Sequence, residues 1–237
     1  MFPIYILIIS HEEIWDLMSS VTNEKVRTIY TATAQRYQMI IKFYRALGVN
    51  LAKWRKDAFA GLPDLKNPRI LDVGTGTGAN LPFLVERYPN YESITGIDYT
   101  PAMLKQAVRR VRDNNWRNID LHLTEASKMS KVLDGCFNLI VSTYSLSIMP
   151  NSLNVLDEIE RLVCDNGYVM LLDCQKFKGL LRIYNPLAIF LSTRLGGSSQ
   201  TYSVPVSETA AKMFHPIRRK LMYSGMFYED LYQKKSS

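Results

Sequence analysis

A glycine-rich segment that directly follows a short apolar run constrains the fold of this chain more than any other feature. Residues 72–78 read Asp-Val-Gly-Thr-Gly-Thr-Gly, end the apolar run 69–73 and precede a helical pattern over residues 79–88. Glycine has no Cβ, so the backbone can turn tightly there and approach a ligand closely. A strand, a glycine turn and a helix in this order predict a ligand site at the edge of an open α/β sheet.

The chain around this loop alternates between strand and helix patterns. Apolar runs predict strands at residues 69–73, 93–98, 119–124, 137–142 and 168–172, with a turn at 165–167 before the last, and helical patterns cover residues 79–88, 101–113 and 153–163. Such alternation is typical of a parallel sheet that is covered on both faces. Residues 219–223 and 226–232 predict an antiparallel C-terminal hairpin. We therefore expect an α/β fold with a doubly wound, mostly parallel, seven-stranded Rossmann-like sheet.

Helical patterns also cover much of residues 12–60, so we expect an N-terminal helical region over residues 1–66 and a single ligand-binding domain over 67–237. Within that domain, the apolar and aromatic segment 176–206 is a candidate substrate cover. Residues 1–9 are apolar, but they lack a basic leader and fall short of the ~20 residues that span a bilayer. A packed terminal segment and a membrane-touching segment both remain open for them.

The 237 residues carry a formal net charge of +7 without any long basic run. We expect no nucleic-acid partner, and keep a small acidic molecule and peripheral contact with a membrane surface as alternatives. The three cysteines, Cys136, Cys164 and Cys174, lack metal-ligand spacing and lie in apolar runs. They predict buried thiols, no disulfide framework and a reducing, cytoplasmic location, with membrane association left open.

Two acids lie near the ends of the first and second predicted strands. Asp72 lies two residues before the first glycine, where it can reach a cationic amino group, and Asp98 ends the second predicted strand, where it can accept hydrogen bonds from both hydroxyls of a ribose. Together they predict a cofactor that contains a nucleoside.

The identity of that cofactor is ambiguous from the loop alone. Gly74, Gly76 and Ala79 match G-x-G-x-x-A, the dinucleotide fingerprint, so an NAD(P)-binding oxidoreductase is one alternative. Against it, Asp72 would repel a pyrophosphate, and Gly78 adds a third glycine at a spacing of two.

The segments ILDVGTGTGANL and TGIDYTPAMLKQA resemble the class I S-adenosylmethionine-dependent methyltransferases. Their wording is most similar to the branch that contains the ubiquinone/menaquinone C-methyltransferases and the bacterial phosphatidylethanolamine N-methyltransferases. The resemblance extends over roughly residues 26–173. It implies S-adenosyl-L-methionine as cofactor and methyl transfer to a small, lipophilic acceptor such as a quinone precursor or a phospholipid head group.

The same resemblance implies particular roles for individual residues. The glycines would pass under the methionine and ribose, and Tyr99 and Met103 would lie near the adenine. Residues 1–66 would form an N-terminal helical lid, in which a tyrosine covers the cofactor. The implied cofactor-binding positions are Asp72, Gly74, Thr75, Gly76, Gly78, Asp98, Tyr99, Met103, Glu125, Ala126 and Ser142. The candidates that would line the substrate are Tyr30, Tyr37, Tyr144, Ser145 and Tyr184. No metal is expected, and no catalytic residue is assigned because the cofactor itself supplies the activation.

The residues at the end of the fourth predicted strand exclude several classes of methyl acceptor. They read Ser142-Thr143-Tyr144-Ser145, whereas methyltransferases of DNA bases carry Asn/Asp-Pro-Pro-Tyr/Phe there. No Glu lies between residues 142 and 150 to hold a guanidinium, and Ser142 is no hard metal ligand. A small-molecule or lipid-like acceptor remains, with a soluble amine, phenol or thiol as the alternative substrate and a non-catalytic methyltransferase-like subunit as an alternative function.

Overall fold

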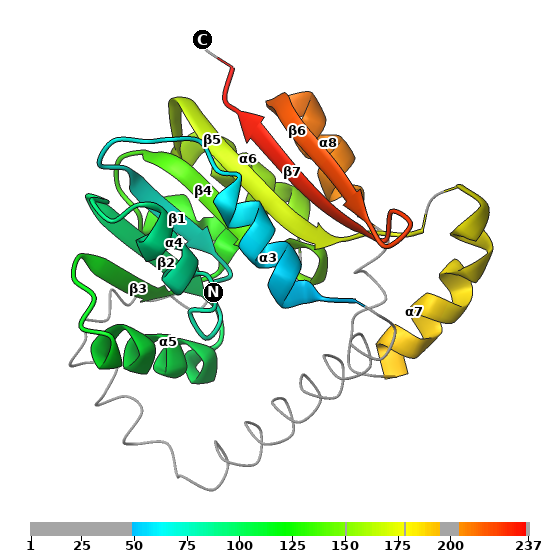
Figure 1. The fold of residues 1–237 in the computed structure, drawn as a ribbon, viewed down its shortest axis with the longest axis horizontal. Helices are drawn as coiled ribbons and strands as arrows, with labels where there is room; N and C mark the ends of the chain where they lie inside the picture. Colours follow the sequence, from blue (N-terminus) through cyan, green and yellow to red (C-terminus); the bar gives the residue numbers. More distant parts are fainter. Residues whose placement is uncertain (1–48, 150, 178, 195–203, 236–237) are drawn as a thin grey trace, which may run out of the picture.

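The computed structural model describes residues 49–149, 151–177, 179–194 and 204–235, and within them helices cover both faces of one seven-stranded sheet (Figure 1). The strands are β1 (Arg69–Val73), β2 (Ser93–Asp98), β3 (Ile119–Leu123), β4 (Phe137–Thr143), β5 (Val163–Cys174), β6 (His215–Met222) and β7 (Phe227–Gln233). The helices are α3 (Leu51–Ala60), α4 (Leu81–Arg87), α5 (Pro101–Asp113), α6 (Ser152–Leu162), α7 (Asn185–Arg194) and α8 (Val206–Met213), with 3-10 helices η1 (Ala126–Lys131), η2 (Leu146–Ile148) and η3 (Gly179–Tyr184). The predicted fold class is confirmed.

The strands lie in the order β3-β2-β1-β4-β5-β7-β6. β1 to β5 are parallel, and β7 pairs antiparallel with both β5 and β6. The predicted terminal hairpin is therefore present, and its second strand is the one that joins the parallel sheet. Residues Tyr223, Ser224 and Gly225 close it with positive φ angles.

Both faces of the sheet are buried, which explains why its central strands read as nearly continuous apolar runs. Successive side chains of β1 show the division: Ile70 packs in the cluster formed with α3, α4 and α5, whereas Leu71 and Val73 pack in the cluster formed with α6 and α8. α3 falls within the region expected as a lid, and it contributes Ala58 and Phe59 to the first cluster.

Most element boundaries differ from the sequence predictions by one or two residues, and two of the differences have a visible cause. α4 begins at Leu81 rather than at residue 79, because the side chain of Asn80 is bonded to the end of β1 and of β4 instead of capping the helix. The expected turn at residues 165–167 does not separate two elements. β5 runs through it to pair Val163 with Phe137. The register between β4 and β5 shifts in this stretch, where Asn166 has a positive φ of 60°.

η3 and α7 stand out from the body of the molecule beyond the end of β5 (Figure 1). Asn185, the first residue of α7, bonds back to the chain before η3: its side chain accepts from the backbone N–H of Phe177 and donates to the carbonyl oxygen of Phe177. No helix in the described part of the chain is both long and apolar enough to cross a bilayer.

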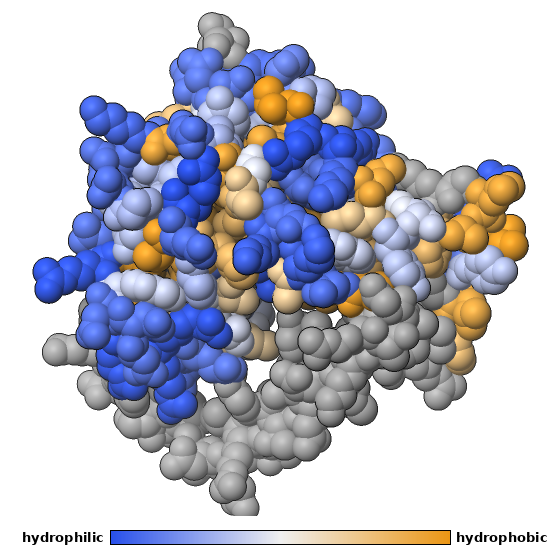
Figure 2. All heavy atoms as spheres, viewed as in Figure 1, coloured by the Kyte–Doolittle hydropathy of each residue, from blue (hydrophilic) through white to orange (hydrophobic). Residues whose placement is uncertain are grey.

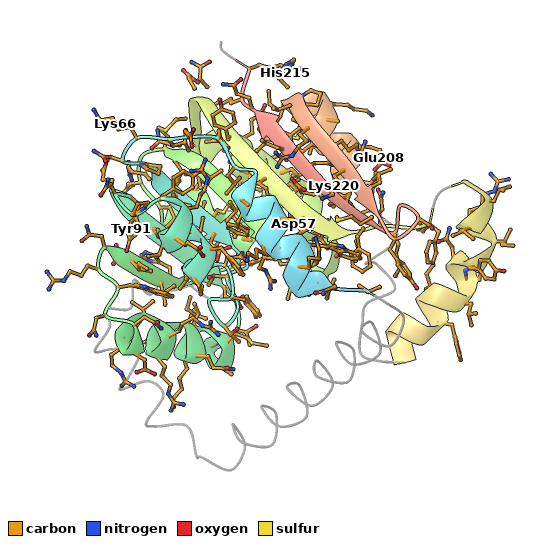
Figure 3. All side chains as sticks on the ribbon, in the orientation of Figure 1. Asp57, Lys66, Tyr91, Glu208, His215 and Lys220 are labelled. Atoms are coloured by element: carbon orange, nitrogen blue, oxygen red, sulfur yellow. A yellow bond between two sulfur atoms is a disulfide. The ribbon has the colours of Figure 1, made fainter. Side chains whose placement is uncertain are left out.

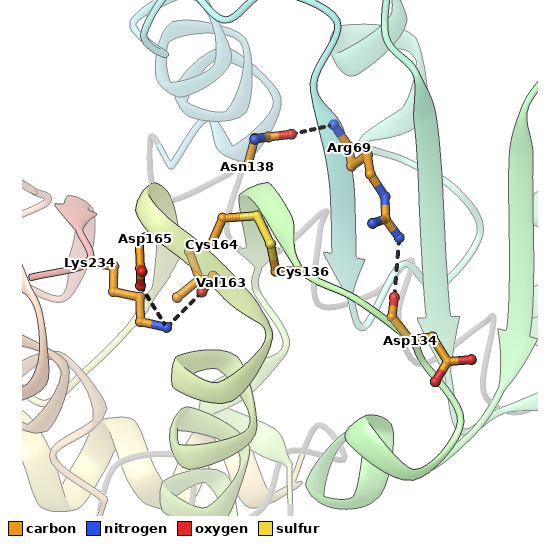
Figure 4. The surroundings of a disulfide bond; sticks show 8 residues. All are labelled: Arg69, Asp134, Cys136, Asn138, Val163, Cys164, Asp165 and Lys234. Atoms are coloured by element: carbon orange, nitrogen blue, oxygen red, sulfur yellow. Dashed lines mark hydrogen bonds and ion pairs between the residues drawn. A yellow bond between two sulfur atoms is a disulfide. The ribbon is translucent and has the colours of Figure 1, made fainter. Parts of the chain in front are cut away.

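The prediction that the cysteines form no disulfide is wrong. Cys136, exposed just before β4, is bonded to Cys164 in β5, and only Cys174 is a free thiol (Figure 4). The two residues meet because β4 and β5 are parallel neighbours whose amino ends start side by side. Nearby, Arg69 donates its backbone N–H to Asn138 and a guanidinium N–H to the carbonyl oxygen of Asp134 (Figure 4).

We expect the Cys136→Ser/Cys164→Ser double variant to lose about 3–4 kcal/mol of unfolding free energy, the chain-entropy value for a closed loop of about this length. Urea denaturation of the oxidised wild-type chain and of the variant measures this difference. Reductant should lower the stability of the wild-type chain alone, and equal stability of both proteins without reductant would contradict the prediction.

Candidate functional site at the carboxyl edge of the sheet

The predicted site residues gather where the carboxyl ends of the parallel strands meet. Asp72 lies in β1, Asp98 ends β2 and Ser142 lies near the end of β4, and these strands are neighbours in the sheet. Ligands of open α/β sheets bind in the crevice at this edge.

The three glycines of the loop all have positive φ angles, but they differ in what surrounds them. A Cβ on Gly74 would lie 2.7 Å from the side chains of Met149 and Ser145, and one on Gly78 would lie 2.9 Å from Leu81. A Cβ on Gly76 would meet nothing closer than 4.0 Å, where Asp98 Oδ2 lies. Gly74 and Gly78 therefore permit packing within the protein, while Gly76 leaves open space above the loop beside Asp98.

Asp72 is fully buried at the end of β1, and both of its carboxylate oxygens are bonded. Oδ2 accepts from the hydroxyl of Thr75 at 2.7 Å, and Oδ1 accepts from the side-chain amide of Asn80 at 2.8 Å. Burial raises the pKa of Asp72 to about 6, against the opposing effects of Thr75, Asn80 and the positive charge of Arg55. A cationic group that reached this carboxylate would relieve its desolvation.

Asp98 holds the other side of the loop. Its Oδ2 accepts from the backbone N–H of Gly76 at 2.9 Å, and its Oδ1 accepts from the N–H of Thr100 at 2.8 Å. Each carboxylate oxygen can accept a further hydrogen bond, so the side chain is both fixed in orientation and able to bind two hydroxyls.

The residues expected beside an adenine form one side of this edge. Tyr99 is 75% exposed, Met103 is half-buried in α5, and Ala126 is buried at the start of η1. Glu125 is held by its neighbours: it accepts from Ser127 at 2.7 Å and pairs with Lys128 at 2.5 Å, and these two hydrogen bonds lower its pKa. Its carboxylate therefore carries an internal ion pair.

The end of β4 is fastened to the end of β1 by two hydroxyls. Ser142 and Ser145 both donate to the carbonyl oxygen of Val73, at 3.0 and 3.2 Å, and their hydroxyl oxygens lie 2.8 Å apart. Tyr144 between them has a φ of 53°, which turns the chain away from the strand. Its hydroxyl donates to the carbonyl oxygen of Leu51 at the start of α3.

A buried acid next to this segment was not anticipated. Asp173, near the end of β5, accepts from the backbone N–H and the hydroxyl of Ser147 at 3.0 and 2.6 Å, and from the N–H of Cys174 at 2.7 Å. Burial raises its pKa. Its three acceptor contacts are all internal, so it fixes η2 against β5 and shapes the segment that follows β4.

Sequence reasoning also missed a chain of hydrogen bonds that ends at Asp72. Arg55 of α3 donates to the hydroxyl of Thr143 at 3.3 Å, Thr143 donates to Asn80 Oδ1 at 2.9 Å, and Asn80 donates to Asp72. Asn80 could have been noticed as the polar residue directly after the loop. Arg55 carries no such signal, because its helix lies before the strand and meets it only in the folded protein.

Of the other three predicted substrate-lining residues, the structure describes only Tyr184. Tyr184 lies at the end of η3 and is 51% exposed. Tyr30 and Tyr37 lie outside the described residues, so their lid role stays a prediction. Thr75, predicted to contact a cofactor, is buried and uses its hydroxyl on Asp72 and its N–H on Ile97.

Comparisons with known proteins converge on one family. A family model described as "Methyltransferase domain" matches residues 64–203. The chain is 26% identical over 188 residues to the ubiquinone/menaquinone biosynthesis C-methyltransferase of Citrifermentans bemidjiense. This alignment covers 76% of this chain and 77% of that protein. It is 37% identical over 100 residues to the malonyl-[acyl-carrier protein] O-methyltransferase of Geobacter sulfurreducens, over 42% of this chain and 36% of that protein. The crystal structure of the N-methyltransferase NodS from Bradyrhizobium japonicum shares the fold, with a TM-score of 0.58 and 13% identity over 78% of this chain and 97% of that one.

The raised pKa of Asp72 predicts a stabilising substitution within the site. In the folded chain this carboxyl titrates near pH 6, above its ordinary value of 3.8, so its ionisation costs stability as pH rises from about 4 through 6. Asp72→Asn should raise the unfolding free energy above pH 7 by up to about 3 kcal/mol, and this gain should vanish below pH 4. The amide can accept from Asn80 and donate to Thr75, which preserves both hydrogen bonds.

Urea denaturation at several pH values measures this gain. Asp72→Ala is the control, because it also removes the charge but leaves the buried Asn80 amide without its acceptor, so it should be about 1–3 kcal/mol less stable than Asp72→Asn. A loss of stability in Asp72→Asn at pH 8 would show that the ionised carboxylate stabilises the fold.

Proposed function

Because this chain belongs to the methyltransferase domain family and is an S-adenosyl-L-methionine-dependent methyltransferase, we propose that it methylates a small, lipophilic acceptor such as a quinone precursor. The family match selects this cofactor over the dinucleotide that the glycine loop left open, and it selects an enzyme over a non-catalytic subunit.

The observation that carries the assignment of the cofactor site is the open space over Gly76. A Cβ there would have no close neighbour, and the nearest side-chain atom is the Asp98 carboxylate at 4.0 Å. A ribose in this space would meet the free acceptor capacity of Asp98, and the buried, anionic Asp72 suits the ammonium group of the methionine end. The residues present therefore fit the cofactor.

Bound there, S-adenosyl-L-methionine supplies a methyl group that is activated by its sulfonium. The protein must hold the acceptor in line and exclude water, so proximity is its main contribution. The segment after β4, fixed by Ser142, Ser145 and the Ser147–Asp173 contact, is the part we propose to line the reacting end. We assign no general base.

The acceptor is proposed from the relatives and from the exposed surface near the site. One relative is named as a C-methyltransferase of quinone biosynthesis and another as an O-methyltransferase of a malonyl carrier, so the acceptor atom differs among them. The segment 176–206 follows β5 and is proposed as the substrate cover. Its apolar side chains favour a lipophilic molecule over a soluble one.

We also propose that this segment contacts a membrane surface. Leu180 is 93% exposed and Ile183 70% exposed, and hydrophobic residues gather over η3 and α7 (Figure 2). Residues 175–207 contain no Asp or Glu, while Lys176 and Arg182 are exposed. Fully burying a large apolar side chain contributes about 1.5–3 kcal/mol, and a basic residue near anionic lipid about 1 kcal/mol.

The acceptor class can be tested with methyl-labelled cofactor. Purified protein, labelled S-adenosyl-L-methionine and a cell extract are incubated, and the product is partitioned between organic and aqueous phases. We expect label in the organic phase, and none with Asp98→Ala, which removes the carboxylate proposed to hold the ribose. Label confined to the aqueous phase would refute the lipophilic acceptor and indicate a soluble amine, phenol or thiol.

The membrane proposal predicts co-sedimentation with vesicles that contain anionic lipid, weaker binding to purely zwitterionic vesicles, and weakening by salt. Leu180→Asp/Ile183→Asp should reduce the bound fraction at least fivefold, since it places two charges on the apolar surface. Arg182→Glu should weaken binding to the anionic vesicles only.

Matched controls lie far from η3 and α7. Ile217→Asp changes a residue of β6 that is 48% exposed and lies close to His215, and Lys66→Glu reverses a charge on the opposite side of the molecule (Figure 3). Neither control should alter binding. Equal binding by the wild-type chain and the Leu180→Asp/Ile183→Asp variant would rule out this surface.

A further inference from the structure

Arg55 is a cation that the described structure leaves without an anionic partner. It is half-buried in α3, its Nε is buried without a hydrogen-bond partner, and no carboxylate of the described residues lies within ion-pair distance of it. A desolvated guanidinium is costly unless it is paired, and its usual partner is a carboxylate or a phosphate.

The guanidinium is nevertheless held firmly in place. It lies over the ring of Tyr144, 5.1 Å from the centroid, and donates to Thr143 at the end of β4. Tyr144 is tied back to α3 through Leu51, while Trp54, the residue before Arg55, packs on Phe227 with ring centroids 5.1 Å apart. A cation fixed by packing is preorganised for a ligand, because little side-chain freedom is left to lose on binding.

Arg55 is connected to the residue that we propose for the methionine end of the cofactor. The hydrogen bonds from Arg55 through Thr143 and Asn80 end on Asp72, the acid proposed to take the ammonium group. The ammonium and carboxylate of an amino acid are attached to one carbon, so a site that binds the first must also receive the second nearby. The positive charge of Arg55 also acts on Asp72, because it lowers the pKa of that carboxyl against the effect of burial.

We propose that Arg55 binds the α-carboxylate of the bound S-adenosyl-L-methionine, so that Asp72 and Arg55 together recognise the two charges of its amino-acid end. This inference rests on the proposed cofactor site and adds a residue from α3 to it. The planar guanidinium matches a carboxylate with two parallel hydrogen bonds, and the unpartnered Nε is one of the donors available for them.

A purely structural role for Arg55 makes a different prediction. If it only supports Thr143 and Asn80, its loss would disturb Asp72 and weaken every ligand that carries the ammonium group. If it binds the carboxylate, its loss would weaken only ligands that carry the carboxylate. A pair of ligands that differ in this group alone therefore separates the two roles.

The test measures binding by calorimetry, without turnover, for S-adenosylhomocysteine and for its decarboxylated analogue, which keeps the amine. Arg55→Met should weaken S-adenosylhomocysteine by roughly 10- to 100-fold, the effect of losing a hydrogen-bonded charge, and change the analogue by less than threefold. Arg55→Lys, which keeps the charge but not the planar fork, should give an intermediate loss for the first ligand alone.

Arg87→Met is a matched control, because Arg87 also lies over an aromatic ring, at 5.2 Å from Tyr88, and also has a buried, unpartnered Nε, but pairs with Asp64. It should leave both affinities unchanged. Equal weakening of both ligands by Arg55→Met would overturn the proposal in favour of structural support. Absence of S-adenosylhomocysteine binding by the wild-type chain would instead overturn the cofactor site itself.

Discussion

The rest of the site depends on the buried carboxylate of Asp72. Its two oxygens accept from Thr75 and Asn80, which precede and follow the last glycine of the loop, so one acid fixes the shape of the whole turn. The backbone N–H of Thr75 then ties the turn to Ile97 of β2. Burying this charge costs stability, in line with its raised pKa, and a cationic group bound next to it would offset that cost.

Polar contacts extend from this acid across the carboxyl edge of the sheet. They reach β4 through Thr143 and α3 through Arg55, and a second group, Ser147 with Asp173, fixes the segment after β4 against β5. The edge is thus a rigid polar frame on an apolar core, as a reaction governed by alignment requires.

The amino and carboxyl ends of the sheet differ in what joins or follows the strands. The amino ends of β4 and β5 are joined covalently through Cys136 and Cys164, away from the site. Beyond the carboxyl end of β5, the chain continues into η3 and α7, where Leu180, Ile183 and Leu187 are exposed. The exposed apolar residues of η3 therefore lie beyond the polar edge, and the lipophilic acceptor that we propose would meet the protein there.

Local sequence patterns were enough to predict most helices and strands and to place the two acids of the site at strand ends. Residues 93–98 and 101–113 were predicted as β2 and α5 with their observed bounds, since apolar run length, a proline at the helix start and a glycine turn act within a few residues. For the same reason Asp72 and Asp98 could be placed at strand ends. Only the tertiary structure links Arg55 and Thr143 to Asp72 through the hydrogen bonds of Asn80. It alone also brings Cys136 to Cys164 across a separation of 28 residues. These contacts follow from the order of strands and the docking of helices, which depend on packing between distant segments and leave no periodic signal in the chain.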